Sequence, residues 1–151
     1  MPPAPRRSSK RPSVREVVVC GRRLPLPPAL VRRVVTRVLE GERREGLVSV
    51  TFLGRDAMRR MNAEHTGRDV PTDVLAFAMT DGIARLVGDV YVCPWVAARE
   101  AKAQGVSLRE ELIRLVVHGT LHALGRTHPE GEGRTRSPMW RRQERYVGAL
   151  A

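Results

Sequence analysis

The sequence predicts an α+β fold, a single domain in which one mixed four-stranded β-sheet packs against helices around a largely apolar central helix. Two observations lead to this fold class. Strand-like and helix-like apolar patterns alternate through the first 92 residues, whereas only helical patterns follow them. The length of 151 residues and the apolar content of 42% suit one domain with its own core.

The first half alternates strands and helices. A helix is predicted from Pro28 to Glu40, where prolines precede an apolar face at helical spacing. Asp56 is expected to cap a short helix that ends near Ala63, before a polar loop from His65 to Asp73. Asp81-Gly82 is expected to form the turn before the last strand. Four segments show the composition of strands: Glu16–Cys20, Leu47–Leu53, Val74–Met79 and Val87–Val92.

Three helices are predicted in the second half. The first runs from Pro94 to Gln104. The second begins at the capping box Ser107-Leu-Arg-Glu110, in which the serine accepts a backbone N–H and the glutamate reaches back. It continues to about Leu124 and is apolar on most faces, so we expect it to be central and buried. Ser137-Pro138 starts the last helix, which extends to about Leu150.

The charge of the chain is strongly positive, with 27 Lys and Arg against 16 Asp and Glu. Residues 1–14 are rich in Pro, Arg and Ser and are expected to form a disordered basic tail, which leaves a folded domain over residues 15–151. Most of the excess charge nevertheless lies in the domain. A genome bias toward arginine explains the choice of Arg over Lys, but it does not explain the excess over acids. The charge therefore favours a polyanionic partner, nucleic acid above all.

Membrane and export signals are not visible in the sequence. No apolar run approaches the ~20 residues of a membrane span, and no apolar segment follows the basic N-terminus. Cys20 and Cys93 both follow strand-like runs, so buried free thiols are expected rather than a disulfide. Together these features predict a cytoplasmic protein without membrane association.

Three of the four histidines fall within eleven residues, in the run HGTLHALGRTH (residues 118–128). His118 and His122 are four residues apart, so they share one face of a helix. Gly125 can end that helix in a left-handed conformation, and His128 can then swing back as a third ligand. The predicted central helix is therefore a metal-binding helix. The fourth histidine, His65, is expected to be an ordinary surface or outer residue.

Three nitrogen ligands and one open position are typical of a catalytic zinc, whereas structural zinc sites fill all four positions with protein ligands. Nickel, copper and cobalt are alternatives for such a site. Zinc lowers the pKa of a bound water to about 7 and polarises carbonyl or phosphoryl oxygens, so hydrolysis of peptides or phosphodiesters is predicted. The spacing matches the metzincin pattern H-E-x-x-H-x-x-G-x-x-H, but Gly119 replaces the glutamate that serves those proteases as general base. Together with the positive charge, this shifts the prediction from peptide to nucleic acid.

Several segments of the chain resemble those of a known family. The histidine run is similar to the YbeY family signature H-G-x-L-H-x-x-G-x-D-H, and further matches cover about residues 15–150. They follow in the family's order along the chain: Met61-Asn62, Gly67–Phe77 with its P-T-D-V-L block, Gly88–Val92, Glu111–Val117 and Met139–Glu144.

The resemblance implies a zinc-dependent, single-strand-specific endoribonuclease. It implies a role in maturation of the 16S rRNA 3′ end and in ribosome quality control. The expected partners are ribosomal RNA, the small ribosomal subunit and ribosome-associated proteins. By the same resemblance, His118, His122 and His128 bind one Zn²⁺.

Two positions depart from the family pattern. Thr66 stands where the family has an arginine thought important for activity, and Arg68 stands two residues on, where it can take over as a phosphate clamp or remain a solvated loop charge. Thr127 replaces an aspartate before the last histidine, which removes a hydrogen-bond partner but no ligand. The general acid or base is therefore left open.

Other polar and aromatic residues have two interpretations. Asp73 and Asp89 can accept histidine N–H groups or cap turns and strand ends, and Thr72 is expected to be structural. Trp95 and Trp140 can stack on bases, although core packing is the usual role of a helical tryptophan. Two rival functions also stay open. One is a metalloprotease with a base from Glu130 or Glu132, and the other is a non-catalytic ribosome-assembly factor with a structural zinc.

Overall fold

The computed structural model describes residues 14–80 and 85–151, which form a four-stranded sheet and helices. The strands are β1 (Arg15–Cys20), β2 (Gly46–Phe52), β3 (Val74–Thr80) and β4 (Leu86–Val92). The helices are α1 (Pro28–Gly41), α2 (Arg55–Thr66), α3 (Pro94–Gln104), α4 (Leu108–Ala123), the 3-10 helix η1 (Gly131–Arg136) and α5 (Pro138–Leu150). The predicted α+β class, with its mixed four-stranded sheet, is confirmed; only η1 was not expected.

The sheet has the strand order β1-β2-β4-β3. Strands β1, β2 and β4 are parallel, and β3 runs antiparallel to β4 at one edge. Parallel neighbours need a crossover, and α1 provides it between β1 and β2. The carboxyl ends of the three parallel strands therefore meet at one edge of the sheet. The amino end of β3 lies at the same edge, because Val74 pairs with Val92.

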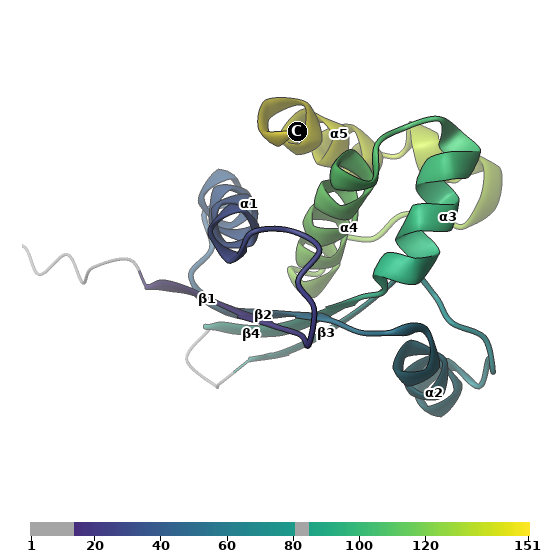
Figure 1. Cartoon of the computed structure of the whole chain (residues 1–151). Coiled ribbons are helices and arrows are strands. Elements are labelled where there is room, and N and C mark those ends of the chain that lie inside the picture. The colour runs from purple at the N-terminus through teal and green to yellow at the C-terminus, as the bar shows by residue number, and fades with distance from the viewer. Residues whose placement is uncertain (1–13, 81–84) are drawn as a thin grey trace, which may run out of the picture.

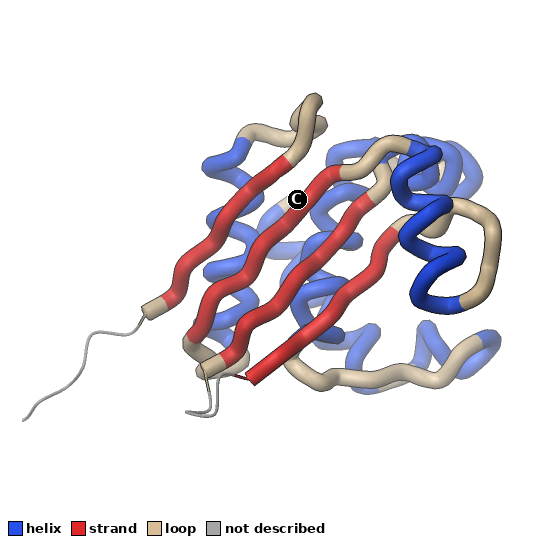
Figure 2. Tube along the Cα trace, turned by 90° about the horizontal axis from the view of Figure 1, so that it is seen from below, coloured by secondary structure: helices blue, strands red, loops and turns tan. Residues whose placement is uncertain are grey.

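Helices α1, α3, α4 and α5 lie over one face of the sheet, and α2 lies toward the other side at one end (Figure 1). Figure 2 shows the opposite face, where no described helix crosses in front of the strands. Side chains alternate between the two faces along each strand, so β2 and β4 bury every second residue. One face therefore forms the core, and the other stays half-exposed.

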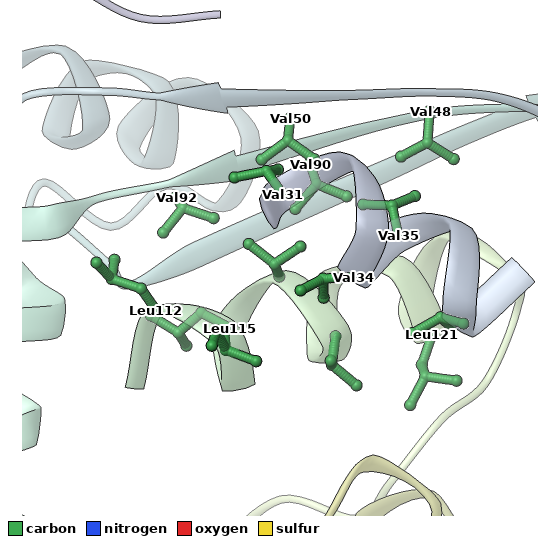
Figure 3. Packing of buried hydrophobic residues seen from close by; sticks show 14 of the residues in the cluster. Val31, Val34, Val35, Val48, Val50, Val90, Val92, Leu112, Leu115 and Leu121 are labelled. Carbon is green, nitrogen blue, oxygen red and sulfur yellow. The ribbon is translucent and has the colours of Figure 1, made fainter. Parts of the chain in front are cut away.

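The core forms where α1 and α4 pack on the middle strands (Figure 3). Val48 and Val50 of β2 are fully buried, as are Val34 and Val35 of α1. Each such side chain contributes about 1.5–3 kcal/mol by leaving water. Ten of the sixteen residues of α4 are buried, which confirms the prediction of a central helix. This burial on several sides fixes the helix that carries two of the histidines.

Helix α2 differs from the prediction at both ends. Gly54, in extended conformation, takes the N-cap position, and Asp56 lies inside the first turn, so the predicted Asp56 cap is wrong. A carboxylate in the first turn still favours the helix through the helix dipole. The helix continues through His65 to Thr66, and it ends only at Gly67, whose φ of 76° is left-handed.

Ser107 caps the N-terminus of helix α4, as predicted for the serine of the capping box. The Ser107 hydroxyl accepts the N–H of Glu110 at 3.1 Å. The Glu110 carboxylate lies 3.5 Å from Arg114, toward the next turn of the helix. Expectations for the basic tail within residues 1–13 and for the Asp81-Gly82 turn lie outside the described residues.

Both cysteines are free thiols, as predicted, but only Cys93 is buried. Cys20 is exposed because it lies on the edge strand β1 and alternates onto the uncovered face of the sheet. Within residues 14–80 and 85–151, the structure has no helix with the length and apolar character of a membrane span.

Candidate metal centre

The end of α4 brings the three histidines together. His118 and His122 lie one turn apart with ring centroids at 4.5 Å. Gly125 then adopts a φ of 89°, and its N–H donates to the His122 carbonyl at 2.9 Å. The next N–H, of Arg126, donates to the Leu121 carbonyl at 3.0 Å. This pair of bonds is a Schellman motif, which reverses the chain and returns His128 toward α4 as predicted.

The Nε2 atoms of the three rings converge. His128 Nε2 lies 3.1 Å from His122 Nε2 and 3.4 Å from His118 Nε2. One ligand atom from each ring falls within 4.8 Å of the others. Zn–N bonds of about 2.0–2.1 Å at tetrahedral angles place ligand nitrogens about 3.3 Å apart. The spacing of the trio therefore fits one metal ion.

On the far side of two of the three rings, Nδ1 contacts an oxygen acceptor. His118 Nδ1 donates to Gln143 Oε1 at 2.6 Å, and His128 Nδ1 donates to the Pro129 carbonyl at 3.0 Å. A proton on Nδ1 of His118 and of His128 leaves the Nε2 lone pair of both rings available to a metal ion. This is the tautomer in which an imidazole ligates a metal ion through Nε2, and the trio could hold one ion.

The surroundings also keep two of the rings neutral. Burial, the neighbouring His128 and Arg134 lower the pKa of His118 to about 4, although Gln143 opposes the shift. Burial and the other two histidines lower the pKa of His122 to about 4. Metal ligation requires the neutral imidazole. These two rings are therefore in the ligating form at neutral pH.

Gln143 is the site residue that the sequence interpretation missed. Its side chain lies on α5, is 1% exposed and contacts His118 from a position 25 residues away in the sequence. The sequence feature that could have identified Gln143 is its position on the apolar face of the last helix. A polar side chain that is buried there must have a hydrogen-bond partner. Its buried neighbours on that face are Met139, Val147 and Leu150.

Asp73 and Asp89 do not accept histidine N–H groups. Asp73 starts β3 by accepting the Val74 N–H at 2.8 Å, and it also accepts the Thr72 hydroxyl at 3.3 Å. Asp89 accepts the Ser49 hydroxyl at 2.6 Å, on the half-exposed face of the sheet. The strand-capping alternative holds for Asp73, and Thr72 is structural, as expected.

The histidine pocket is a cavity of about 460 Å³ between α3, α4, β3 and the η1–α5 segment. Its charged lining consists of two arginines, Arg114 and Arg134, and three carboxylates, from Asp73, Glu100 and Glu111. Without a cation, the lining is therefore not basic.

The two arginines of the pocket differ in their partners. Arg114 binds Glu144 at 2.7 Å and Glu111 at 3.1 Å, and the Glu144 contact holds the pKa of Arg114 above its ordinary value. Burial raises the pKa of Glu111 despite that ion pair. Arg134 lies over the Trp140 ring at 5.2 Å, and no ion pair within residues 14–80 and 85–151 includes it.

Several predicted residues lie away from this pocket. Arg68 is exposed just after α2 and is not among the lining residues, so its role stays a prediction. The hydroxyl of Thr66 donates to the Asn62 carbonyl at 2.8 Å, within the last turn of α2. Glu130 and Glu132, the bases considered for a protease, are exposed and outside the lining.

The two tryptophans have different surroundings. Trp140 lines the histidine pocket, whereas Trp95 is 41% exposed at the start of α3. Core packing was the usual expectation for both positions, and it is wrong for Trp95. The reason is its place in the first turn of α3, at the edge of the sheet rather than over it.

Gly119 explains why the protease glutamate is absent. A Cβ at this position would lie 2.5 Å from Val90 Cγ1 and 3.1 Å from Val74 Cγ2. Helix α4 therefore approaches the sheet so closely that any side chain at residue 119 would displace it. The close approach fixes the two histidines of α4 against the sheet, and it leaves no room for a general base at that place.

Comparison with known proteins identifies the family of the chain. The family model described as Endoribonuclease YbeY matches residues 27–151. A protein named Endoribonuclease YbeY from Carboxydothermus hydrogenoformans is 37% identical over 122 residues, which cover 80% of this chain and 84% of that protein. Another of the same name, from Pelotomaculum thermopropionicum, is 38% identical over 130 residues, with 80% and 84% covered.

A solved structure has the same fold. The solution structure of TM1509 from Thermotoga maritima superposes with a TM-score of 0.64 at 25% identity, and the match covers 89% of this chain and 88% of that one. The family model spans the histidine run and α5, and each of these two relatives covers 80% of the chain. The chain therefore belongs to the Endoribonuclease YbeY family.

Proposed function

We propose that the chain is a zinc-dependent endoribonuclease that cleaves single-stranded ribosomal RNA, matures the 16S rRNA 3′ end and acts in ribosome quality control. It works in the cytoplasm on the small ribosomal subunit, together with ribosome-associated proteins. Family membership supports the endoribonuclease activity. The observation that supports the metal dependence is the convergence of three histidine Nε2 atoms at the wall of an open pocket.

His118, His122 and His128 would hold the ion. When bound, it would supply a Lewis acid that activates water and polarises a phosphodiester. The chain itself fixes the ligand rings through Gln143 and the Pro129 carbonyl, so little reorganisation accompanies binding.

Arg134 is the pocket group best placed to bind the phosphate. Its guanidinium lines the pocket, stacks on Trp140 and has no carboxylate partner in the described part of the chain. An arginine can hold two phosphate oxygens at once and stabilise the charge that develops on them. Arg114 is less suited, because Glu111 and Glu144 already occupy its donors.

The test is cleavage by purified, zinc-loaded, full-length protein. The substrates are a single-stranded RNA, the same RNA annealed to its complement, and casein. We expect cleavage of the single strand alone. Casein cleavage without RNA cleavage would establish a peptidase instead.

Two matched variants separate catalysis from folding. His118→Ala should lose both zinc and RNA cleavage, whereas His65→Ala, the one histidine outside the trio, should keep both. If His118→Ala folds, binds RNA and still supports 16S rRNA maturation in cells, the protein is a non-catalytic assembly factor and the proposal fails.

A further inference from the structure

We propose that a second cavity, separate from the histidine pocket, binds a segment of single-stranded RNA away from the cleavage point. We call it the distal groove and define it by six residues: Arg22, Arg23, Leu24, Arg55, Arg60 and Trp95. The nature of the polyanion rests on the proposed function. The groove itself rests on its own geometry, and it shares no lining residue with the histidine pocket.

The groove lies where the parallel strands end. The loop after β1, the end of β2 with the start of α2, and the start of α3 form its walls. Its volume is about 970 Å³, roughly twice that of the histidine pocket at about 460 Å³. The carboxyl ends of parallel strands are a common location for ligand sites in α/β sheets. A cavity of this size accepts a base with its sugar and phosphate.

Charge distinguishes the groove from the histidine pocket. Among the described residues, four arginines and a single carboxylate, from Asp56, line it, whereas two arginines and three carboxylates line the histidine pocket. All four groove arginines are exposed, and none forms an ion pair within residues 14–80 and 85–151. Apart from the single phosphate assigned to Arg134, the mixed charge of the histidine pocket offers little attraction for a polyanion, so further phosphate contacts must come from elsewhere on the surface.

Trp95 supplies the second element of single-strand recognition. Its side chain is 41% exposed, and the guanidinium groups of Arg55 and Arg99 each lie 4.8 Å from its ring centroid. Leu24, 39% exposed, adds apolar surface to the same cavity. Unpaired bases stack on aromatic rings and on guanidinium planes, so a base can extend the Arg55–Trp95 stack.

This combination favours a single strand over other polyanions. A duplex keeps the faces of its bases stacked inside, where the Arg55–Trp95 stack does not reach. The acidic side chains of a peptide offer charge but no aromatic ring to stack. Helix α3 carries Trp95 of the groove at one end and Gln104 of the histidine pocket at the other. An RNA strand that follows α3 would therefore occupy both cavities.

The test measures the affinity of full-length protein for a fluorescent single-stranded 2′-O-methyl RNA of about twelve nucleotides, a length within the usual range of single-strand sites. Trp95→Ala should weaken binding at least about fivefold, and Trp95→Phe should recover most of it. Arg22→Ala/Arg23→Ala should lower the slope of log affinity against log salt by about 1.4, since each lost contact to a single strand contributes about 0.7. The matched control is Arg32→Ala/Arg33→Ala, an exposed arginine pair on α1.

A direct signal comes from the second tryptophan. The chain has two tryptophans, so Trp140→Phe leaves Trp95 as the sole indole reporter. Adding the RNA to this variant should change the Trp95 emission, and the same RNA annealed to its complement should not.

Three results would overturn the proposal: equal affinities for the groove variants and the α1 control, no emission change, or equally effective competition by polyglutamate. The last would assign the groove to an acidic protein partner. Because these readouts are of binding, they remain valid even if the protein cleaves no RNA.

Discussion

Gln143 should control the metal affinity of the three histidines, although it is not itself a metal ligand. Its Oε1 accepts the His118 Nδ1–H at 2.6 Å, and the side chain is 1% exposed, so no water replaces it. In Gln143→Leu the His118 N–H would be left buried without a partner, which costs about 1–3 kcal/mol. Loss of an outer hydrogen-bond partner weakens metal binding by about 10–100-fold. At 1.4 kcal/mol per tenfold, the two figures agree.

The assay is competition for zinc between the protein and a chelator of known affinity. Gln143→Leu should show the loss, and Gln143→Glu, which keeps an acceptor and adds negative charge, should bind zinc at least as tightly as the native chain. Gln104→Leu is the matched control, because Gln104 lines the same pocket but is exposed and makes no described contact with a histidine. Equal affinities for Gln143→Leu and the native chain, or an equal loss in the Gln104 variant, would refute the reasoning.

Three further predictions follow from the packing and the charges. Gly119→Ala should lower the free energy of unfolding by about 1–3 kcal/mol in denaturant titrations, because the added methyl displaces α4 from the sheet; unchanged stability would contradict the close approach. Glu42 has a side chain only 3% exposed, and although burial acts to raise its pKa, three partners outweigh burial and lower it: Tyr146, Arg142 and Arg126. The ionised Glu42 should therefore stabilise the fold above the ordinary carboxyl pKa, and this stabilisation should be lost as the pH falls through the lowered pKa of Glu42. Glu42→Gln should be less stable at neutral pH, and its free energy of unfolding should fall less steeply as the pH is lowered. Parallel stability–pH curves for the two chains would argue against this. Arg134→Ala should slow RNA cleavage by about a hundredfold without loss of zinc, whereas Arg68→Ala should have a smaller effect; the reverse order would return the phosphate clamp to Arg68.

The sequence predicted the parts of the site that are local. The spacing of His118 and His122 places them on one face of a helix. Gly125 indicates that the chain reverses after this helix, which brings His128 back toward it. Eleven consecutive residues therefore contain nearly all the information that places the three rings. Periodicity likewise identified α4 as central, because an apolar helix on most faces has to be buried.

The parts that the sequence did not predict depend on contacts between distant segments. Gln143 reaches His118 only because α5 packs on α4, and the spacing within either helix does not indicate the pairing. Trp95 looks like a core residue until the sheet edge is known. The distal groove combines loops that follow two different strands with the start of α3. The order of the strands in the sheet decides which loops lie next to one another. The apolar pattern that identifies each strand in the sequence does not give that order.

The central claim is that His118, His122 and His128 jointly bind one metal ion, and metal analysis of the full-length protein, purified without an affinity tag or chelator, tests it most directly. We expect about one equivalent of zinc per chain, lost when any one of the three is changed to Ala and retained in His65→Ala. Full metal content after removal of one of the three rings, or no bound metal in the native chain, would contradict it.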